Sequence, residues 1–250
     1  MKQLSTYMLT IILTPLILFI TSSLFYDQYQ RGYLFTTRSS NETIFIDRAL
    51  KRIATCNELD HPRQKSLLYT LQAWTHLARA NHIRYWLGYR TLDGYLYHHD
   101  LPPYDHDIDI LIMARDTPQL INLINRNYPS IYKLKVHPQW FITKISNRSY
   151  FSSEGIDFKM QNARFINQKT NVSINIWPVY DDHFNKNTLA FVNYLHLDSW
   201  ILIPTDWTFP LEPCVISGIK VWCPAQPKRL TASMSSTYLS CINGAWVDAK

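Results

Sequence analysis

The stretch that decides the fold is Pro102-Pro103-Tyr104-Asp105-His106-Asp107-Ile108-Asp109-Ile110, in which three aspartates alternate before an apolar run. In an extended backbone, side chains two residues apart share a face, and their Cα atoms lie about 7 Å apart. The alternative is that this stretch is a solvated turn. Asp109, however, lies between apolar neighbours, where an unpaired carboxylate is costly. We therefore interpret Asp105, Asp107 and Asp109 as a site for a hard cation such as Mg2+ or Mn2+, which binds carboxylate and phosphate oxygens.

The bulk composition indicates one globular domain with appendages. The chain has 250 residues, of which 46% are hydrophobic and 14% aromatic, enough for one sizeable core. Its formal net charge of +6 suits an anionic substrate or an acidic membrane surface. Because the basic residues are scattered without a long run, nucleic acid is not expected as a partner.

Residues 7–26 form an uncharged segment that, as a helix, would be about 30 Å long and could cross a bilayer. A cleaved signal peptide is the alternative, because Thr21-Ser22-Ser23 offers small residues near a possible cleavage point. The length of the run favours a signal anchor, with residues 1–6 in the cytosol. We expect a single-pass type II protein of the Golgi or endoplasmic reticulum membrane, with a lumenal stem (27–60) and a lumenal domain (61–250).

The cysteines and glycosylation sequons fit a lumenal location. Four cysteines permit three pairings, and Cys214 with Cys223 is favoured because the residues between them could fold back as a hairpin. Four buried free thiols are the alternative, and the spacing is not that of a zinc site. Sequons begin at Asn41, Asn147 and Asn171, of which Asn41 lies in a polar stretch and is the favoured acceptor.

Apolar spacing predicts the main elements. Residues 67–81 read as a packing helix, 83–87 as a strand and 91–100 as a turn leading back to the aspartate strand at 105–113. A second helix is predicted from Thr117, with a proline in its first turn. Further strands are predicted at 131–136, 140–145, 172–177 and 215–222. The mixture lacks regular βαβ alternation, which indicates an α+β fold with helices packed on a mixed sheet.

Several motifs together resemble the LicD/fukutin family, which includes the fukutin-related protein. Residues 85–94, YWLGYRTLDG, resemble the family's G-[ST]-L-L-G turn, and residues 103–109, PYDHDID, resemble its P-W-D-x-D-[IV]-D motif. Ile174-Asn175-Ile176-Trp177-Pro178 is similar to the family's D-[IV]-[FW]-P strand. Residues 202–204 and 218–224 look like its closing block.

The resemblance implies a nucleotidyltransferase-like fold and a metal-dependent phosphotransferase. Such an enzyme would move an alcohol phosphate, either phosphocholine or an alditol phosphate, from a CDP-activated donor onto a glycan, with Mg2+ or Mn2+ as cofactor. Carried onto this chain, Asp107 and Asp109 would be metal ligands, with Asp105 nearby. The residues expected at the donor are Arg90, Thr91, Gly94, His98 and His99.

Two positions depart from the family pattern. Arg90 stands where the family has glycine, and it could bind phosphate, block the site or be a surface turn residue. Asn175 stands where the family has a third carboxylate; an amide oxygen can bind a hard metal but cannot act as a general base. The implied catalytic set is Asp107, Asp109 and Asn175, with Asp157 or the pair Asp181-Asp182 as possible substitutes for the missing carboxylate.

Two other functions stay open at this point. A non-catalytic relative that binds a glycan or a partner would explain Arg90 and Asn175. An ordinary nucleotide-sugar glycosyltransferase would use Asp105 and Asp107 as its D-x-D, leaving Asp109 dispensable. His106 is expected to point away from the aspartates, while Tyr104 and Trp177 could stack on a pyrimidine or simply pack in the core.

Overall fold

A computed structural model describes residues 40–124, 131–141, 151–153, 156–158, 160–182, 185–193, 199–234 and 239–248. The expected segments 1–6 and 7–26 and the sequon at Asn147 lie outside the described residues. Among the helices of the described residues, none is long and apolar enough to span a bilayer. Residues 39–250 belong to one compact unit.

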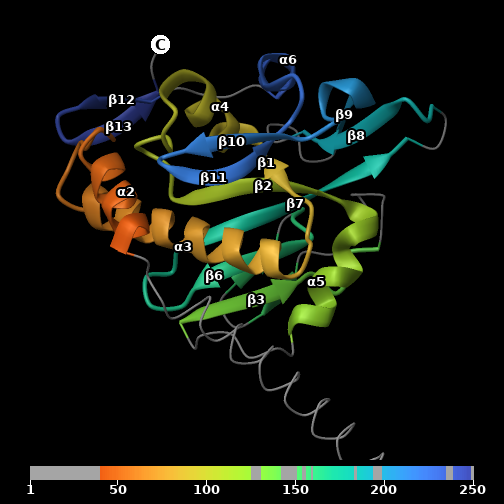
Figure 1. Ribbon diagram of the computed structural model, residues 1–250, viewed down its shortest axis with the longest axis horizontal. Coiled ribbons are helices and arrows are strands. Elements are labelled where there is room, and N and C mark those ends of the chain that lie inside the picture. Colours follow the sequence, from red (N-terminus) through yellow and green to blue (C-terminus); the bar gives the residue numbers. More distant parts are fainter. Residues whose placement is uncertain are drawn as a thin grey trace, which may run out of the picture. The chain divides into compact units, whose positions relative to one another are not determined.

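The described residues form five α-helices and a central sheet with smaller hairpins (Figure 1). The helices are α2 (Ser40–Leu50), α3 (Asp60–Ala80), α4 (Tyr89–His98), α5 (Thr117–Ile124) and α6 (Pro227–Ser233). The central sheet contains β1 (Trp86–Leu87), β2 (Asp107–Met113), β3 (Tyr132–Val136), β6 (Ala163–Asn167), β7 (Ser173–Asp181), β8 (Thr188–Val192) and β9 (Trp200–Pro204). The hairpins pair β4 (Phe151–Ser153) with β5 (Ile156–Phe158), β10 (Glu212–Ile216) with β11 (Ile219–Cys223), and β12 (Leu239–Ile242) with β13 (Ala245–Asp248).

The sheet is mixed, as the sequence predicts. Its order is β1-β2-β7-β6-β3, and β8 pairs with the second half of β7 and with β9. β2 and β7 run parallel, whereas the other pairings in this sheet are antiparallel. The parallel register places Asp107 opposite Ser173 and Asp109 opposite Asn175. Two segments far apart in sequence are therefore joined at the aspartate motif.

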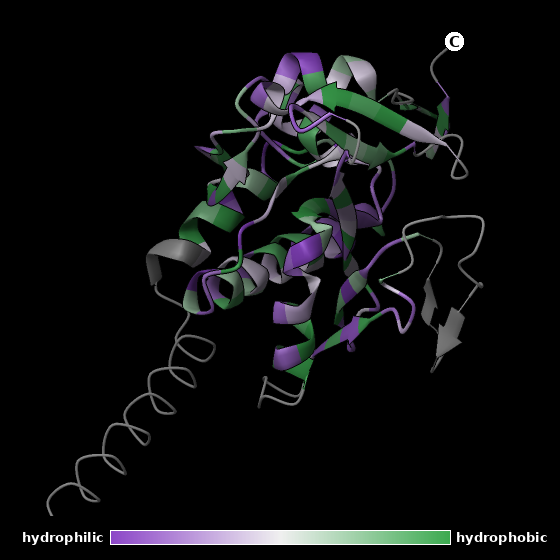
Figure 2. Ribbon diagram, turned by 90° about the vertical axis from the view of Figure 1, so that its right-hand side faces the viewer, coloured by the Kyte–Doolittle hydropathy of each residue, from purple (hydrophilic) through white to green (hydrophobic). Residues whose placement is uncertain are grey.

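The two faces of the sheet differ in character. Residues 108, 110 and 112 of β2 are fully buried isoleucines on one face, because side chains alternate along a strand. The long helix α3 crosses the sheet (Figure 1), and its buried Trp74 contacts the Phe165 ring of β6 at a centroid distance of 5.7 Å. The helices carry alternating purple and green bands in Figure 2, the amphipathic character expected of helices that cover a core. Asp107 and Asp109 occupy the opposite face.

Three parts of the structure differ from the sequence-based expectations. Helix α2 lies within the segment 27–60, and its Ile46 and Ala49 are fully buried, so this segment contributes to the core. Residues 91–100 are mostly helix α4 and not a turn, because Thr91 and Leu92 bury completely on a helical face. At the expected strand 140–145, the described residues 140 and 141 are in a turn.

All four cysteines form disulfides, so the free-thiol alternative is wrong. Cys214–Cys223, the pair favoured from the sequence, closes the β10–β11 hairpin with a Cα separation of 5.9 Å. Cys56–Cys241 joins the segment before α3 to β12, across 185 residues of sequence. The second disulfide attaches the C-terminal hairpin to the start of the long helix.

Candidate functional site

Asp107, Asp109 and Asn175 converge on one face of the sheet. Asn175 donates from Nδ2 to Asp107 Oδ2 at 2.7 Å and to Asp109 Oδ1 at 3.2 Å. Trp177, two residues further along β7, donates from Nε1 to Asp109 Oδ1 at 2.8 Å. Asp109 and Asn175 are buried, whereas Asp107 is partly exposed. The arrangement thus has a buried inner carboxylate and an outer one that solvent or a ligand can reach.

The inner carboxylate lies in an environment that disfavours its charge. Burial and, to a lesser extent, the nearby charge of Asp107 together raise the pKa of Asp109 to about 7, although the donors Trp177 and Asn175 and the charge of Arg90 oppose the shift. Two carboxylates so close repel each other unless a cation or donors lie between them. The pair is therefore an environment in which a bound cation would lower the electrostatic free energy.

The buried Asp105 forms an ion pair with the partly exposed Arg90, beside Asp107 and Asp109. Arg90 Nε lies 3.1 Å from Asp105 Oδ1, and Asp105 is only 3% exposed. The pKa of Asp105 is raised to about 8, first by burial and then by the charges of Asp109, Asp107 and Asp93, while Arg90 opposes the shift. Arg90 is therefore not a surface residue of a turn: it lies in helix α4 and pairs with Asp105. Asp93, which the sequence did not single out, is a further buried carboxylate near this site.

Helix α4 holds the backbone of β2 in place behind the site. Thr91 Oγ1 accepts the Asp109 backbone N–H at 2.9 Å, and the Gly88 N–H donates to the Asp109 carbonyl at 3.1 Å. Tyr89 has a positive φ of 47° and donates its hydroxyl proton to the Val192 carbonyl at 2.8 Å. Thr91 thus positions the inner aspartate through its main chain.

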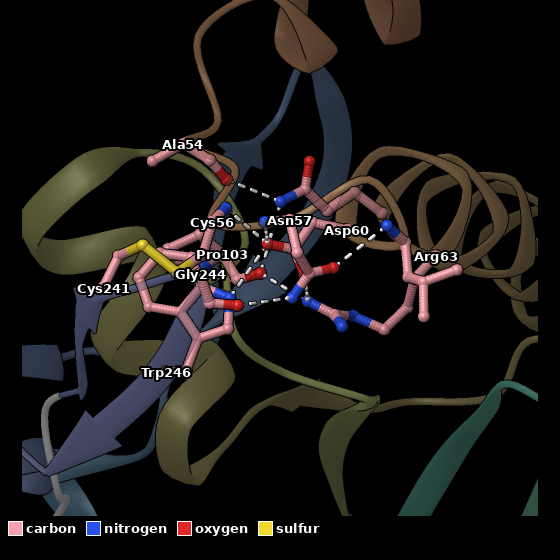
Figure 3. Close-up of polar contacts among 11 residues, drawn as sticks. Ala54, Cys56, Asn57, Asp60, Arg63, Pro103, Cys241, Gly244 and Trp246 are labelled. Carbon is pink, nitrogen blue, oxygen red and sulfur yellow. Dashed lines mark hydrogen bonds and ion pairs between the residues drawn. A yellow bond between two sulfur atoms is a disulfide. The ribbon is translucent and has the colours of Figure 1, made fainter.

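The loop before β2 is fixed by the first turns of α3. Arg63 Nη2 and Gln64 Nε2 donate to the Pro103 carbonyl at 2.8 and 3.2 Å (Figure 3). Gln64 also donates to the Ala54 carbonyl at 2.7 Å. Since Pro103 precedes Asp105 by two residues, these contacts restrict where the aspartate motif begins.

Asp60 connects this support to the C-terminal hairpin. Its fully buried carboxylate accepts from the Cys56 and Asn57 backbone N–H groups and from Trp246 Nε1 at 3.0 Å, and it pairs with Arg63 at 2.7 Å (Figure 3). Burial alone would raise the pKa of Asp60, but these donors and Arg63 together lower it. The ring of Trp246 also contacts Tyr104 at a centroid distance of 5.7 Å. The hairpin therefore reaches the aspartate motif itself.

A row of polar side chains crosses the sheet from the aspartates. In register, Asp109 is opposite Asn175, Asn175 is opposite Arg164 of β6, and Arg164 is opposite Lys135 of β3. Arg164 donates to Ser173 Oγ at 2.6 Å. The sequence analysis did not select Arg164 or Lys135. Their alternation with the buried Leu134 and Phe165 is the signal that could have placed them on the aspartate face.

Several expected donor-binding residues lie elsewhere. His98 and His99 end α4, about 12 Å along the helix from Arg90, and the structure does not bring them to the aspartates. Gly94 lies inside α4, where an added Cβ would come within 2.5 Å of Pro102 Cδ and 2.6 Å of the Asp100 carbonyl oxygen. The close approach of helix and loop, and not a phosphate, explains this glycine.

Two of the possible substitutes for a third carboxylate, Asp181 and Asp182, do not reach the site. Asp181 lies at the far end of β7, roughly 20 Å from Asn175, and forms an ion pair with Arg115. Asp182 follows it. The backbone of Asp157 belongs to the separate β4–β5 hairpin.

His106 is exposed beside the aspartate motif, and its pKa is lowered by partial burial and by Arg63.

The oxygen atoms at the site suit a hard cation. Among the described residues, no group of three or more His, Cys, Asp or Glu side chains is arranged to hold a metal. The two carboxylates nevertheless approach one amide nitrogen, and Asn175 Oδ1 is buried without a hydrogen-bond partner in the described residues. Two carboxylates and an amide oxygen are ligands that Mg2+ and Mn2+ accept.

Residues 82–226 match the model of the LicD/FKTN/FKRP nucleotidyltransferase domain. The chain belongs to this family. The matched range includes the whole of α4, β2 and β7, and hence Arg90, Asp105, Asp107, Asp109 and Asn175. Membership in the LicD/FKTN/FKRP family indicates a transferase of the phosphotransferase type. A comparison with curated proteins gave no match.

Proposed function

We propose that this LicD/FKTN/FKRP-family chain transfers an alcohol phosphate, either phosphocholine or an alditol phosphate, from a CDP-activated donor to a glycan hydroxyl. The observation that carries the proposal is the convergence of Asp107, Asp109 and Asn175 beside the Arg90–Asp105 pair. This arrangement combines oxygen ligands for a divalent cation with a guanidinium that can face phosphate oxygens. The donor is thus expected to place its diphosphate between the two aspartates and Arg90.

In the proposed reaction, the acceptor oxygen forms a bond to the phosphorus that carries the alcohol, and the bond from this phosphorus to CMP breaks. The hydroxyl proton is released to water, because the amide of Asn175 cannot accept it. Mg2+ or Mn2+ bound by Asp107 and Asp109 would offset negative charge on the donor phosphates, and Asn175 could add its Oδ1 only after its amide turned over, because its Nδ2 faces both carboxylates. Thr91 and Trp177 hold Asp109 in position. Arg164 and Lys135 extend the cationic surface along the sheet for an anionic substrate.

The proposed location is the lumen of the Golgi or endoplasmic reticulum, with a type II signal anchor at residues 7–26. Two disulfides support an oxidising compartment. The sequon asparagine Asn171 is exposed in the turn between β6 and β7, where a glycosyltransferase could reach it. Asn41 lies in the first turn of α2. The proposed partners are therefore a membrane, a CDP-alcohol and a glycan or glycoprotein.

The test is metal-dependent CMP release by the full chain reconstituted in lipid nanodiscs. CDP-choline, CDP-ribitol and CDP-glycerol are each supplied with a mixed glycan acceptor and Mn2+ or Mg2+. One donor should yield CMP, and Asp107→Asn or Asp109→Asn should lower the rate at least 100-fold, whereas the exposed Asp206→Asn should not change it. Absence of CMP release with every donor, from a folded chain, contradicts the proposal.

A second candidate is a non-catalytic relative, and one observation favours it. The Asn175 amide already bridges both aspartates, so the pair has donors without a cation. This candidate predicts no thermal stabilisation by Mn2+ with any CDP-alcohol. The glycosyltransferase alternative instead predicts that Asp109→Asn keeps activity with a nucleotide sugar.

A further inference from the structure

A hollow in the surface lies away from the candidate site at the aspartates. It has a volume of about 790 Å3 and lies between the end of α3, the residues before β1, the segment 209–213 and β11. β1 runs antiparallel to β2 with Trp86 opposite Leu111, so the residues before Trp86 extend toward the end of β2 that is remote from Asp107. Along β2, the position beside Tyr85 is three residues from Asp109, about 10 Å, and the hollow lies on the α3 side of the sheet, opposite to the aspartates. This hollow is therefore not part of the candidate phosphotransferase site.

The floor of the hollow is apolar. Ala78, Ile83, Tyr85 and Val221 line it and are each no more than 5% exposed, so their side chains form a fixed surface. Trp222, which is 43% exposed, also lines it. An exposed tryptophan beside a buried apolar floor favours a hydrocarbon group as the bound moiety. The volume of the hollow falls within the range of small-molecule sites, about 300 to 1,000 Å3.

Basic side chains line the same hollow, and no aspartate or glutamate does. Within the part of the chain that the structure describes, neither Arg79 nor Lys220 forms an ion pair. Arg84 lies 3.7 Å from Asp116, but its side chain is 67% exposed, so this contact leaves it available. His82 is the fourth basic residue. The charge of the lining is complementary to an anionic group.

A smaller hollow of about 230 Å3 adjoins the first, and the two share Thr75, Arg79 and Lys220. Its lining adds Phe45 of α2, which is 46% exposed. Together the two hollows form a trough: Phe45 lines the smaller hollow, Trp222 lines the larger one, and the cations Arg79 and Lys220 line both. We call this trough, defined by the residues of the two hollows, the α3–β11 trough.

We propose that the α3–β11 trough binds an amphiphile with a hydrocarbon chain and a single anionic head group. A small polar anion would use the cations but would leave the apolar floor in contact with water. A purely apolar molecule would cover the floor but would desolvate Arg79 and Lys220 without an anionic partner, which is costly. Only a molecule with both a hydrocarbon chain and an anionic group matches both the apolar floor and the cations of the lining.

The test compares hexyl phosphate, hexanol and inorganic phosphate by calorimetry on the full chain in nanodiscs of neutral lipid, with empty nanodiscs as the blank. Hexyl phosphate should bind at least tenfold more tightly than either fragment. The double variant Arg79→Gln/Lys220→Gln and the single variant Trp222→Ala should each weaken binding about tenfold. The matched variant Lys169→Gln/Lys228→Gln, which neutralises two exposed lysines elsewhere, should not change it.

Asp107→Asn separates this proposal from the proposed function, because it alters the aspartate site and should leave hexyl phosphate binding unchanged. Equal affinity for hexanol or inorganic phosphate would overturn the proposal, as would binding that the Arg79, Lys220 and Trp222 variants leave intact. Failure of hexyl phosphate to bind, with Lys220-dependent binding only to vesicles of anionic lipid, would assign the surface to a membrane instead.

Discussion

The side-chain nitrogen of Asn175 lies 2.7 Å from Asp107 Oδ2 and 3.2 Å from Asp109 Oδ1, so one amide joins two carboxylates. A carboxylate at this position would repel both neighbours when no cation is present. The amide thus stabilises the metal-free arrangement and reduces the negative charge that a metal would meet.

Asn175→Asp should reverse this balance. In the presence of a chelator, the melting temperature should fall, because three carboxylates then share the site. With saturating Mn2+, it should rise by more than that of the unchanged chain, and the affinity for Mn2+ should increase about tenfold, equivalent to about 1.4 kcal/mol. Thermal melts with and without Mn2+ test this, with the exposed Asn187→Asp as the matched control. An unchanged Mn2+ affinity would argue against a cation at this position.

At about pH 9, above the raised Asp105 pKa of about 8, Arg90→Gln should destabilise the chain, because it leaves the buried, ionised Asp105 carboxylate without its cation. The expected loss is about 3 kcal/mol of unfolding free energy. The double variant Arg90→Gln/Asp105→Asn should recover most of this loss, since an amide pair carries no unpaired charge. Denaturant unfolding of the unchanged chain, the single variants Arg90→Gln and Asp105→Asn, and the double variant forms a double-mutant cycle, and a coupling free energy near zero would contradict the pairing.

Thr91→Val should cost about 1 to 3 kcal/mol, because the Asp109 backbone N–H loses a buried acceptor without a change in side-chain volume. Thr91→Ser keeps the hydroxyl and should retain most of the stability. Hydrogen exchange at the Asp109 amide distinguishes local from global effects: it should accelerate in Thr91→Val and stay slow in Thr91→Ser.

Asp60 should contribute stability that depends on pH. Its lowered pKa means that the folded state favours the carboxylate, so the contribution is present above the unfolded pKa of about 4 and is lost as the pH falls through the folded pKa. Asp60→Asn should therefore be destabilising at neutral pH, and its deficit relative to the unchanged chain should shrink in acid. Unfolding free energies at a series of pH values test this. A deficit independent of pH would contradict a charged role for Asp60.

Gly94→Ala should be destabilising although alanine is the better helix former. The new Cβ would lie 2.5 Å from Pro102 Cδ and 2.6 Å from the Asp100 carbonyl, so the loop before the aspartates must move. We expect a loss of about 1 to 3 kcal/mol by overpacking, against a gain of about 1 kcal/mol from helix propensity. An unchanged or raised melting temperature would show that the loop accommodates the methyl group at no cost.

The sequence predicted the elements that carry strong periodicity. The alternation around Asp109 predicted β2 and its polar face, and the apolar spacing near Trp74 predicted α3. The hairpin between Cys214 and Cys223 followed from their spacing. In each case, the residue pattern that predicts the element lies within the element's own stretch of sequence.

The sequence could not predict contacts that depend on long-range register. Arg164 and Lys135 reach the aspartate face only because β7 pairs parallel with β2 and antiparallel with β6. Residues 91–100 were expected to be a turn, whereas most of them form α4, and the close approach of Gly94 to Pro102 depends on how the helix packs against the loop that follows it. The role of Trp246 as a donor to Asp60, across 186 residues, has no local signal at all.

The C-terminal hairpin lies beyond the residues that match the family, yet Cys56–Cys241 and Trp246 connect it to Asp60 and Tyr104. During synthesis, therefore, Cys56 gains its disulfide partner and Asp60 gains its Trp246 donor only after the residues of this hairpin have been made. A premature stop codon after residue 234 would retain every residue of the candidate active site. It would nonetheless leave a chain with an unpaired Cys56 thiol and a buried Asp60 that lacks one hydrogen-bond donor, so we expect such a truncation to act through folding and stability and not through altered chemistry.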